Sequence, residues 1–433
     1  LAAAVALAAP AHADSIDYAV TKLVSDIPGN ATNPSPDPDL LNPWGVAFNP
    51  NGFVWVNDNH GGKSTLYDGH GVKQSLVVTI PPASGTGLGS PTGITFNATT
   101  DFRIVVPPAT TSVAAAFLFV SEDGVISAWA PGLTTAQVVA TSATANYKGV
   151  AIAADGVANH LYAADFTGRK IDVYTNAFAP TTVPGGFADP SIPAGYGPFN
   201  VMAFQGNLYV AYAKIGADGD EVAGEGLGFV RVFDANGFLL NRLASRGPLN
   251  APWGMALAPA GFGRFSNRLL VGNFGDGMIN AFDAKTGNFV GRMRTGKGKP
   301  QGIDGLWGIA FGSGVKDQPT DTLFFAAGAN DNRSRESRRF PREVGMFLHV
   351  VNVSYLGNYR VRLTFNDGAV KDVDLANELY GEVFERLNDP AFFAQVAVNP
   401  DTGTVEWPNG ADFAPEFLYE TGTTVQPSAQ AVA

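Results

Sequence analysis

Short apolar segments separated by Gly, Asn and Asp fill residues 42–327, and one unit of this pattern returns six times. Each copy contains a segment that starts beside a Gly, a turn, and a second segment that is almost entirely apolar. The six pairs of segments are 42–48 and 53–58, 91–96 and 117–123, 147–152 and 161–165, 198–204 and 208–212, 252–257 and 269–273, and 306–311 and 323–327. Recurrence about every 50 residues is typical of a repeat architecture.

The copies predict strands, because each apolar segment is short and ends at turn-forming residues. Some copies add a third strand, such as 171–174 or 278–283. One small sheet cannot bury both of its faces until neighbouring sheets stack on it, so strand-only units of this period build propeller blades. The pattern therefore predicts an all-β, six-bladed β-propeller over residues 14–330, with Tyr18–Val24 as a strand that closes the last blade.

A Gly follows Trp, Thr or Lys at the start of the first segment in five copies, and Asn200 takes this place in the fourth. We expect the innermost strand to start there, where backbones crowd the axis and a Cβ atom fits poorly. Asn tolerates an unusual φ angle better than most residues, which would explain Asn200. Trp44, Trp253 and Trp307 are interpreted as packing between blades rather than as a stacking platform for a ligand.

After Gly328 the repeat stops without its third strand, and residues 331–345 are rich in Arg and Ser. An arm that binds nucleic acid has the least support, because the protein carries a formal net charge of −11. A flexible linker fits the composition. A fusion seam, in which a damaged or misread reading frame joined two genes, fits equally well, since Met346 resembles the start of a separate chain. The linker and the seam both remain open.

The pattern of residues 346–420 predicts a small α+β domain, which differs from the repeated strand units before it. Apolar and polar residues alternate over 359–365, which is the periodicity of a strand. The Asn366-Asp367-Gly368 turn then predicts a hairpin whose return strand reaches Leu375. Asp389-Pro390 predicts the N-cap and first turn of a short helix. Residues 421–433 are expected to form a disordered tail.

The composition and the N-terminal residues indicate the compartment of the protein and exclude several kinds of site. The chain has no Cys, which excludes disulfides, thiolate metal sites and a Cys nucleophile. The apolar run at residues 1–13 ends in Ala11-His12-Ala13 and predicts the end of a secretory signal peptide that is cleaved after Ala13. This run is too short to span a bilayer, and no later apolar run is long enough. The protein is therefore expected to be exported, to the periplasm or the cell exterior.

Polar residues after the second strand of each copy are the candidates for a binding site on one face of the disc. If the copies align, these residues ring the mouth of the central channel. They are Asn57, Asp58, His60, Glu122, Asp123, Asp165, Tyr212, Asn273 and Asp276. Asp58, Asp165 and Asn273 are also candidate metal ligands for Ca²⁺, which prefers oxygen ligands. A structural interpretation competes, since Asn and Asp at strand ends commonly bond their own backbone.

Two further segments offer polar chemistry. The acidic stretch Asp218–Glu225 carries oxygen ligands for Ca²⁺ but lacks the EF-hand order, so a solvated loop is the simpler interpretation. In the small domain, Trp407, Asn409 and Asp412 are candidates for a surface site, against the simpler explanation that the Trp packs beside an Asn-Gly turn. No His spacing typical of a zinc site and no Gly-x-Ser-x-Gly motif occurs.

The stretch LYAADFTGRKIDVY at 161–174 resembles an NHL-type propeller repeat. Residues 17–330 as a whole resemble an uncharacterised bacterial family of exported six-bladed propellers, some of which carry a C-terminal PEP-CTERM sorting signal. The motifs that carry this resemblance are LVSDIPG (23–29), NPWG (42–45) and LFFAAGAND (323–331). The family brings no assigned activity, and this sequence departs from it by ending without the PEP tripeptide, apolar helix and basic tail.

Residues 347–419 resemble a small bacterial domain of unknown function. The resemblance rests on Asp389-Pro390, on NPDTGTVEWPNGAD at 399–412 and on Leu418-Tyr419. Such domains are mostly cytoplasmic and are often encoded beside a small partner in toxin–antitoxin-like pairs. An antitoxin-like module is hard to reconcile with export unless the two halves are separate products.

Taken together, the sequence favours an exported, monomeric propeller, non-enzymatic or of unassigned activity, that binds a protein or a glycan on one face, with the small domain as an accessory. The alternative is a Ca²⁺-dependent lactonase or lyase. Ca²⁺ is the one cofactor for which the sequence offers ligands, and neither nucleic acid nor a membrane span is expected.

Overall fold

The computed structural model describes residues 4–7, 17–29, 31–32, 36–295, 302–328, 343–346, 348–379, 382–399, 403–413 and 415–425. Strands dominate these residues, as the sequence predicted. The helices among them are short, and none is long and apolar enough to cross a membrane. They are η1 (Asn59–Gly61), η2 (Gly263–Phe265), η3 (Glu382–Asn388), α1 (Pro390–Phe393) and α2 (Pro415–Thr421). The expected cleavage site at Ala11–Ala13 and the Arg/Ser stretch before Glu343 lie outside the described residues.

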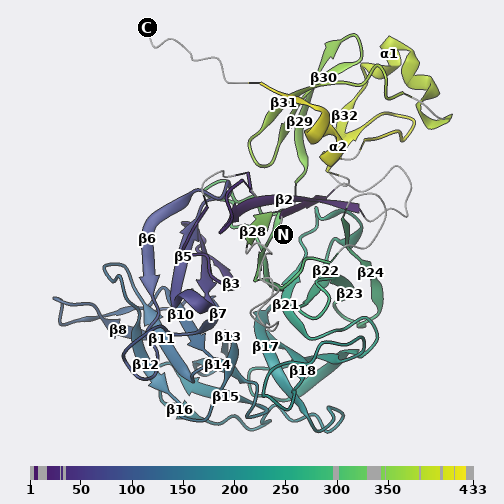
Figure 1. The fold of residues 1–433 in the computed structure, drawn as a ribbon. Helices are drawn as coiled ribbons and strands as arrows, with labels where there is room; N and C mark the ends of the chain where they lie inside the picture. Colours follow the sequence, from purple (N-terminus) through teal and green to yellow (C-terminus); the bar gives the residue numbers. More distant parts are fainter. Residues whose placement is uncertain are drawn as a thin grey trace.

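Six sheets, antiparallel except for one short pair of strands in the sixth, lie around a common axis (Figure 1). The first five each contain four strands that follow one another in chain order from the axis outward. These strands are β3 (Pro43–Phe48), β4 (Val54–Asp58), β5 (Lys63–Tyr67) and β6 (Lys73–Thr79); β7 (Pro91–Phe96), β10 (Phe117–Ser121), β11 (Val125–Trp129) and β12 (Gln137–Thr141); β13 (Tyr147–Ala154), β14 (Asn159–Asp165), β15 (Lys170–Thr175) and β16 (Pro180–Thr181); β17 (Tyr196–Phe204), β18 (Asn207–Lys214), β19 (Gly228–Phe233) and β20 (Leu239–Ser245); and β21 (Pro252–Leu257), β22 (Arg268–Asn273), β23 (Ile279–Asp283) and β24 (Phe289–Arg292). A hairpin, β8 (Arg103–Val105) and β9 (Ser112–Ala114), is inserted between β7 and β10.

The sixth sheet is assembled from distant parts of the chain. Its strands from the axis outward are β26 (Leu306–Phe311), β27 (Leu323–Ala327), β28 (Glu343–Met346) and β2 (Asp17–Ser25), and β2 also pairs with β1 (Ala4–Leu7) and β25 (Arg294–Thr295). The closing role of β2 confirms the prediction for Tyr18–Val24. The third strand, which the sequence pattern lacked, is β28, antiparallel to both β27 and β2. The last residues of the expected linker therefore belong to this sheet.

The innermost strands close a ring. Each of β3, β7, β13, β17, β21 and β26 contacts the next, and β26 contacts β3. The described residues between 17 and 346 therefore have a propeller-like fold.

Glycines hold this ring together by leaving room for neighbouring backbones. A Cβ atom on Gly45 would lie 2.5 Å from the carbonyl oxygen of Thr92, and one on Gly308 would lie 2.6 Å from that of Trp44. Neither glycine has a positive φ angle. Crowding at the axis, as expected, explains why these positions are Gly.

Asn200 takes the same place in the fourth sheet for a different reason from the one expected. Its φ angle is not positive, so the explanation from backbone tolerance was wrong. Instead, Nδ2 of Asn200 donates a hydrogen bond to the carbonyl oxygen of Trp253 at 2.8 Å. The amide therefore bridges the fourth and fifth sheets.

The small domain contains one four-stranded sheet and one hairpin. The sheet order is β29 (Val350–Gly357), β30 (Arg360–Phe365), β31 (Val370–Asp374) and β34 (Thr423–Thr424), and the hairpin is β32 (Ala397–Asn399) with β33 (Thr404–Glu406). The predicted β30–β31 hairpin is confirmed, and so is the N-cap, since Oδ1 of Asp389 accepts from the amide of Ala391 at 2.9 Å. The expected tail starts later than predicted, because β34 pairs with β31. Residues 426–433 lie outside the described part.

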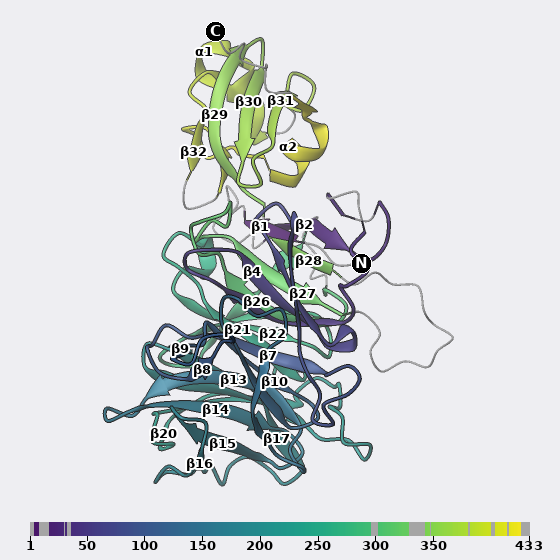
Figure 2. The ribbon, with the colours of Figure 1, turned by 90° about the vertical axis from the view of Figure 1, so that its left-hand side faces the viewer.

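The small domain rests on the edge of the sixth sheet (Figure 2). Nδ2 of Asn366 donates to the hydroxyl of Thr322 at 2.8 Å, and both side chains are buried. Nε2 of His349 lies 3.4 Å from Oδ2 of Asp321, and this hydrogen bond holds the pKa of Asp321 below its usual value. The two parts therefore share a polar contact as well as strand β28.

The ring of glycines gives a direct test. Gly308→Ala should lower the free energy of unfolding by about 1–3 kcal/mol, because the new methyl group overlaps the backbone of Trp44. Gly261→Ala is the matched control, since no atom lies within 4 Å of a Cβ built there. Urea denaturation of both variants measures the difference. An equal change in both would contradict crowding as the cause.

Candidate functional site

All six sheets present equivalent strand ends on one side of the ring, here called the strand-end face. The start of each innermost strand pairs with the end of the next strand, as in Pro43 with Asp58 and Tyr147 with Asp165. Because the ring glycines of neighbouring sheets lie side by side, these ends gather on the same side. The face therefore contains the site candidates that follow the second strands.

Asn57 and Asp58 are buried beneath this face and have structural partners. Nδ2 of Asn57 donates to the carbonyl oxygens of Thr92 (3.1 Å) and Gly93 (3.2 Å), which links the first sheet to the second. Oδ2 of Asp58 accepts from the hydroxyl of Thr65 at 2.8 Å. Burial raises the pKa of Asp58 well above its usual value, so this carboxyl favours the neutral form and is a poor cation ligand.

His60 and Asp123 lie at the surface. His60 belongs to η1 and is exposed. Asp123 follows β10, and its Oδ2 accepts a hydrogen bond from the amide of Ala83 at 2.6 Å. The carboxylate therefore fastens a neighbouring loop.

Asp165, Asn273 and Asp276 are engaged in the turns that follow β14 and β22. Oδ1 of Asp165 accepts from the amides of Asn146 and Gly168, each at 3.0 Å. Nδ2 of Asn273 donates to Oδ1 of Asp276 at 3.0 Å. The turn-forming interpretation of these residues fits their contacts.

The three residues that the sequence offered as Ca²⁺ ligands are spread over the ring. Asp58, Asp165 and Asn273 lie in the first, third and fifth sheets. Among the described residues, no three His, Asp or Glu side chains are grouped so that they could hold a metal ion. The donor set therefore does not fit a shared Ca²⁺ site.

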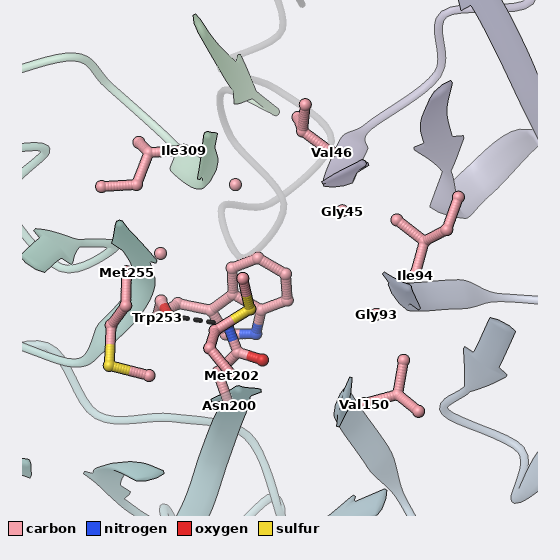
Figure 3. A pocket seen from close by; sticks show the side chains of 12 residues that line it. Gly45, Val46, Gly93, Ile94, Val150, Asn200, Met202, Trp253, Met255 and Ile309 are labelled. Carbon is pink, nitrogen blue, oxygen red and sulfur yellow. Dashed lines mark hydrogen bonds between the residues drawn. The ribbon is translucent and has the colours of Figure 1, made fainter. Parts of the chain in front are cut away.

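Aromatic side chains close the axis at the strand-end face. Trp44 and Trp307 stack with their ring centroids 3.4 Å apart, and Trp253 meets both of them edge-on. All three are buried, which supports the packing interpretation. Figure 3 shows the ring of Trp253 across the centre of the channel. The remaining lining is mostly apolar and includes Val46, Ile94, Val150, Met202, Met255 and Ile309.

Lys148 is a buried cation in this aromatic layer. Its Nζ lies 4.9 Å from the ring centroid of Trp44 and donates to Oε1 of Glu122 at 2.5 Å. Burial alone would lower the pKa of Lys148, but the charges of Glu122 and Glu221 outweigh it and raise that pKa. Lys148 therefore remains charged and is an ion-pair partner rather than a nucleophile.

The acidic stretch Asp218–Glu225 is more than a solvated loop. Residue Ile215 forms a β-bridge with Glu221, and the amide of Gly216 donates to the carbonyl oxygen of Asp220 at 2.6 Å. Burial raises the pKa of Glu221 to about 7, while the charge of Lys148 opposes that rise. The loop thus adds a second carboxylate to the electrostatic surroundings of Lys148.

A second hollow, here called the interblade pocket, lies between the third and fourth sheets. It is open to solvent and has a volume of about 330 Å³. Its lining is Arg169, Lys170, Ile171, Gly186, Phe187, Ala188, Asp189, Ile192, Pro193, Ala194, Tyr196, Pro198 and Tyr212. Of the sequence candidates, Tyr212 is found here rather than at the mouth of the channel.

The wall of the interblade pocket is fixed by a buried ion cluster. Asp189 lies in the connection 182–195, and its carboxylate accepts from Nε of Arg231 (2.6 Å) and from Nε of Arg242 (2.9 Å). Burial would raise the pKa of Asp189, but hydrogen bonds from Arg242, Ser191 and Arg231 hold it well below its usual value. The connection is therefore anchored to the fourth sheet.

Two tyrosines add uncharged polar groups to this pocket. Tyr196 and Tyr212 are 8% and 7% exposed, and their rings pack in the core between the sheets. Neither hydroxyl has a hydrogen-bond partner among the described residues, and neither is a sealed polar atom. Both hydroxyls therefore reach solvent.

In the small domain, Trp407 is not a surface residue. It is 1% exposed, and its Nε1 donates to the carbonyl oxygen of Phe393 at 2.6 Å. Nδ2 of Asn409 donates to the carbonyl oxygen of Val383 at 2.7 Å, and Asp412 forms a bridge with Glu406. The surface site expected there was wrong for Trp407, because its ring completes the core.

Sequence reasoning missed Lys148, Arg169, Tyr196 and Asp189 as site residues, whereas Glu221 lies in the acidic stretch that it had offered for Ca²⁺. One signal was available for Lys148, since it precedes a ring glycine where three other copies have Trp. The connection 182–195 shows no periodicity, so nothing in it indicated that Asp189 would be buried.

Residues 350–424 match the model of the family described as protein of unknown function DUF2442. This confirms a domain of unknown function at this end of the chain. Across the chain, the uncharacterized protein R648 of Acanthamoeba polyphaga mimivirus is 35% identical over 310 residues, which cover 68% of this chain and 74% of R648. The chain belongs to the R648 family. Uncharacterized protein L690 of the same virus is 36% identical over 286 residues, 63% of this chain and 74% of L690.

R648 and L690 are both uncharacterized and carry no assigned activity. Membership of the expected bacterial, PEP-CTERM-associated family stays a prediction. Among solved structures, a protein of unknown function from Bacteroides thetaiotaomicron superposes with a TM-score of 0.46 at 11% identity, covering 76% of this chain and 74% of its own. PQQ-bound aldose sugar dehydrogenase from Streptomyces coelicolor gives 0.45 at 17% identity, covering 78% and 99%. Likenesses this distant carry no argument about the function of this R648-family chain.

The raised pKa of Glu221 predicts a pH-dependent stability. Its pKa rises from 4.5 to about 7, so the stability linked to its neutral form is present below pH 4.5 and is lost as the pH rises through 7. Glu221→Gln cannot ionise. We therefore compare the free energy of unfolding of Glu221→Gln with that of wild type at each pH. The difference in favour of the variant should be larger at pH 8 than at pH 4.5, by about 1–2 kcal/mol after allowance for partial exposure.

Thermal unfolding at the two pH values measures this difference. Glu225→Gln, in the same loop but 79% exposed, is the matched control and should behave alike at both. A Glu221→Gln variant that loses stability at pH 8 would show instead that attraction to Lys148 outweighs burial.

Proposed function

We propose that this chain is an exported, six-bladed, NHL-like propeller that binds a glycan without transforming it. The binding site is the interblade pocket. The six sheets and the ring of innermost strands support the blade number. The predicted signal peptide supports export, and the DUF2442 segment acts as an accessory domain on the edge of the sixth blade.

The observation that carries this proposal is that the hydroxyls of Tyr196 and Tyr212 have no hydrogen-bond partner in the part of the chain that the structure describes. Both hydroxyls reach solvent in one hollow and neither is used by a described residue, so a ligand hydroxyl can replace the water there and form these hydrogen bonds. Burial raises the pKa of Tyr212, so its hydroxyl keeps its proton at neutral pH and can donate.

The rest of the pocket suits a sugar. Sugars present many hydroxyls around a compact, partly apolar ring. Phe187, Ile192 and Ile171 provide apolar contact area, and the two hydroxyls provide directional polar contacts. Asp189 and its arginines hold the wall in place before a ligand arrives, which lowers the entropic cost of binding.

A Ca²⁺-dependent lactonase or lyase has less support. Its candidate ligands Asp58, Asp165 and Asn273 are far apart in the ring order, and each has a hydrogen-bond partner of its own.

Removing both hydroxyls tests the proposal. An array of neutral and acidic oligosaccharides is probed with labelled wild type and with the Tyr196→Phe/Tyr212→Phe double variant. The double variant should bind the sugars that wild type retains about tenfold to a hundredfold more weakly, since two hydrogen bonds are lost.

Tyr209→Phe is the matched control, because Tyr209 is on the same strand β18, is 7% exposed and does not line the pocket. It should bind like wild type. Wild type that retains no sugar, or a folded double variant that binds as well as the control, would contradict the proposal.

A further inference from the structure

The interblade pocket has a charge that the proposed function leaves unexplained. Its lining contains two cationic side chains, Arg169 and Lys170, and one carboxylate, Asp189. The protein as a whole has a formal net charge of −11. A local excess of positive charge in such a protein points to an anionic partner.

The charge of Asp189 is balanced by the two arginines beside it, so this carboxylate does not pair with a ligand. Oδ2 of Asp189 accepts from Arg231 and from the hydroxyl of Ser191, and Oδ1 accepts from Arg242. The side chains of Asp189 and Arg231 are at most 1% exposed. This carboxylate is therefore used inside the protein.

Lys170 is also neutralised within the protein. Its Nζ pairs with Asp172 and lies 3.6 Å from Oδ2 of Asp165. Burial would lower the pKa of Lys170, but these carboxylates raise it, so the ion pairs persist at neutral pH.

Arg169 is the remaining cation. It is exposed at the rim of the pocket, and it has no ion pair or side-chain hydrogen bond among the described residues. Over the lining and its direct ion partners, four cations face three carboxylates. Lys170 is paired with two carboxylates and Asp189 with two arginines, so Arg169 is the cation of this set that has no ion partner among the described residues.

Arg169 lies in a turn whose backbone conformation is fixed by hydrogen bonds. The φ angle of Arg169 is 57°, a left-handed conformation that is uncommon for a residue with a side chain. The turn is stabilised by Asp165, whose Oδ1 accepts from the amide of Gly168, and by the amide of Arg169, which donates to the carbonyl oxygen of Phe166 at 3.2 Å. Asp165, a candidate from the sequence, therefore positions the rim of the pocket.

We infer that the ligand of the interblade pocket is an acidic sugar, whose carboxylate pairs with Arg169 while its hydroxyls meet Tyr196 and Tyr212. This inference rests on the proposed function, because it specifies the glycan that the pocket takes. A guanidinium is suited to a carboxylate, since it can donate two parallel hydrogen bonds to it.

Matched sugars test the inference with the full chain. The probes are glucuronate and glucose, which differ only at C6, a carboxylate in the first and a hydroxymethyl group in the second, and the β-1,4-linked trimers of each. Titration calorimetry should show that wild type binds the acidic member of each pair about fivefold to tenfold more tightly. That preference should shrink when salt is raised from 0.1 M to 0.5 M, because ions screen an exposed pair.

Arg169→Gln should abolish the preference and leave the affinity for the neutral sugar unchanged. Arg103→Gln, at an exposed arginine on β8 outside the pocket, is the control and should keep the preference. Equal affinity of wild type for acidic and neutral sugars, or an unchanged preference in Arg169→Gln, overturns the acidic-sugar inference alone. Binding of neither sugar overturns the proposed function as well.

Discussion

The close approach of six innermost strands around one axis is the constraint on which the rest of this structure depends. At Gly45 and Gly308 the backbone of one sheet meets that of the next with no room for a side chain. This contact sets the spacing of the sheets at the axis, and the sheets then diverge outward. The layer of Trp44, Trp253 and Trp307 closes the axis above the ring. Space for a ligand is therefore found between sheets rather than along the channel.

Polar side chains at the strand-end face divide into two groups by their partners. Asn57, Asp165 and Asn273 are used within the protein, in contacts between sheets or within turns, and such contacts satisfy backbone groups that the ring would otherwise bury. Tyr196 and Tyr212 differ, because their rings are buried while their hydroxyls have no partner among the described residues. The distinction between these groups rests on partners and not on residue type, which is why strand-end polarity alone did not locate the site.

Most of the fold could be predicted from local patterns in the sequence. Short apolar strands beside ring glycines predicted the successive sheets, and the alternation at 359–365 predicted β30, because both depend on residues near one another in the chain. Strand β28 escaped prediction, since four residues without an apolar pattern pair with strands far away in the sequence. The position of Asn200 on the innermost strand was predicted correctly, but the reason given for it was wrong. Its side chain is explained by a hydrogen bond to Trp253, which lies in another sheet.

The candidate site was less predictable than the fold. Tyr212 was identified from its place after a second strand, yet its neighbours in the pocket come from a connection without periodicity. The pairing of Asp189 with Arg231 spans 42 residues and depends on how two sheets meet. Arg169 gave no signal in the sequence, because its lack of a partner is a property of the assembled surface.

A crystal structure of the protein soaked with the β-1,4-linked trimer of glucuronate tests this account most directly. The account predicts the sugar between the third and fourth sheets, in contact with both tyrosine hydroxyls and with a carboxylate at Arg169. A trimer bound over the tryptophans at the axis, with the interblade pocket filled by water alone, would contradict it.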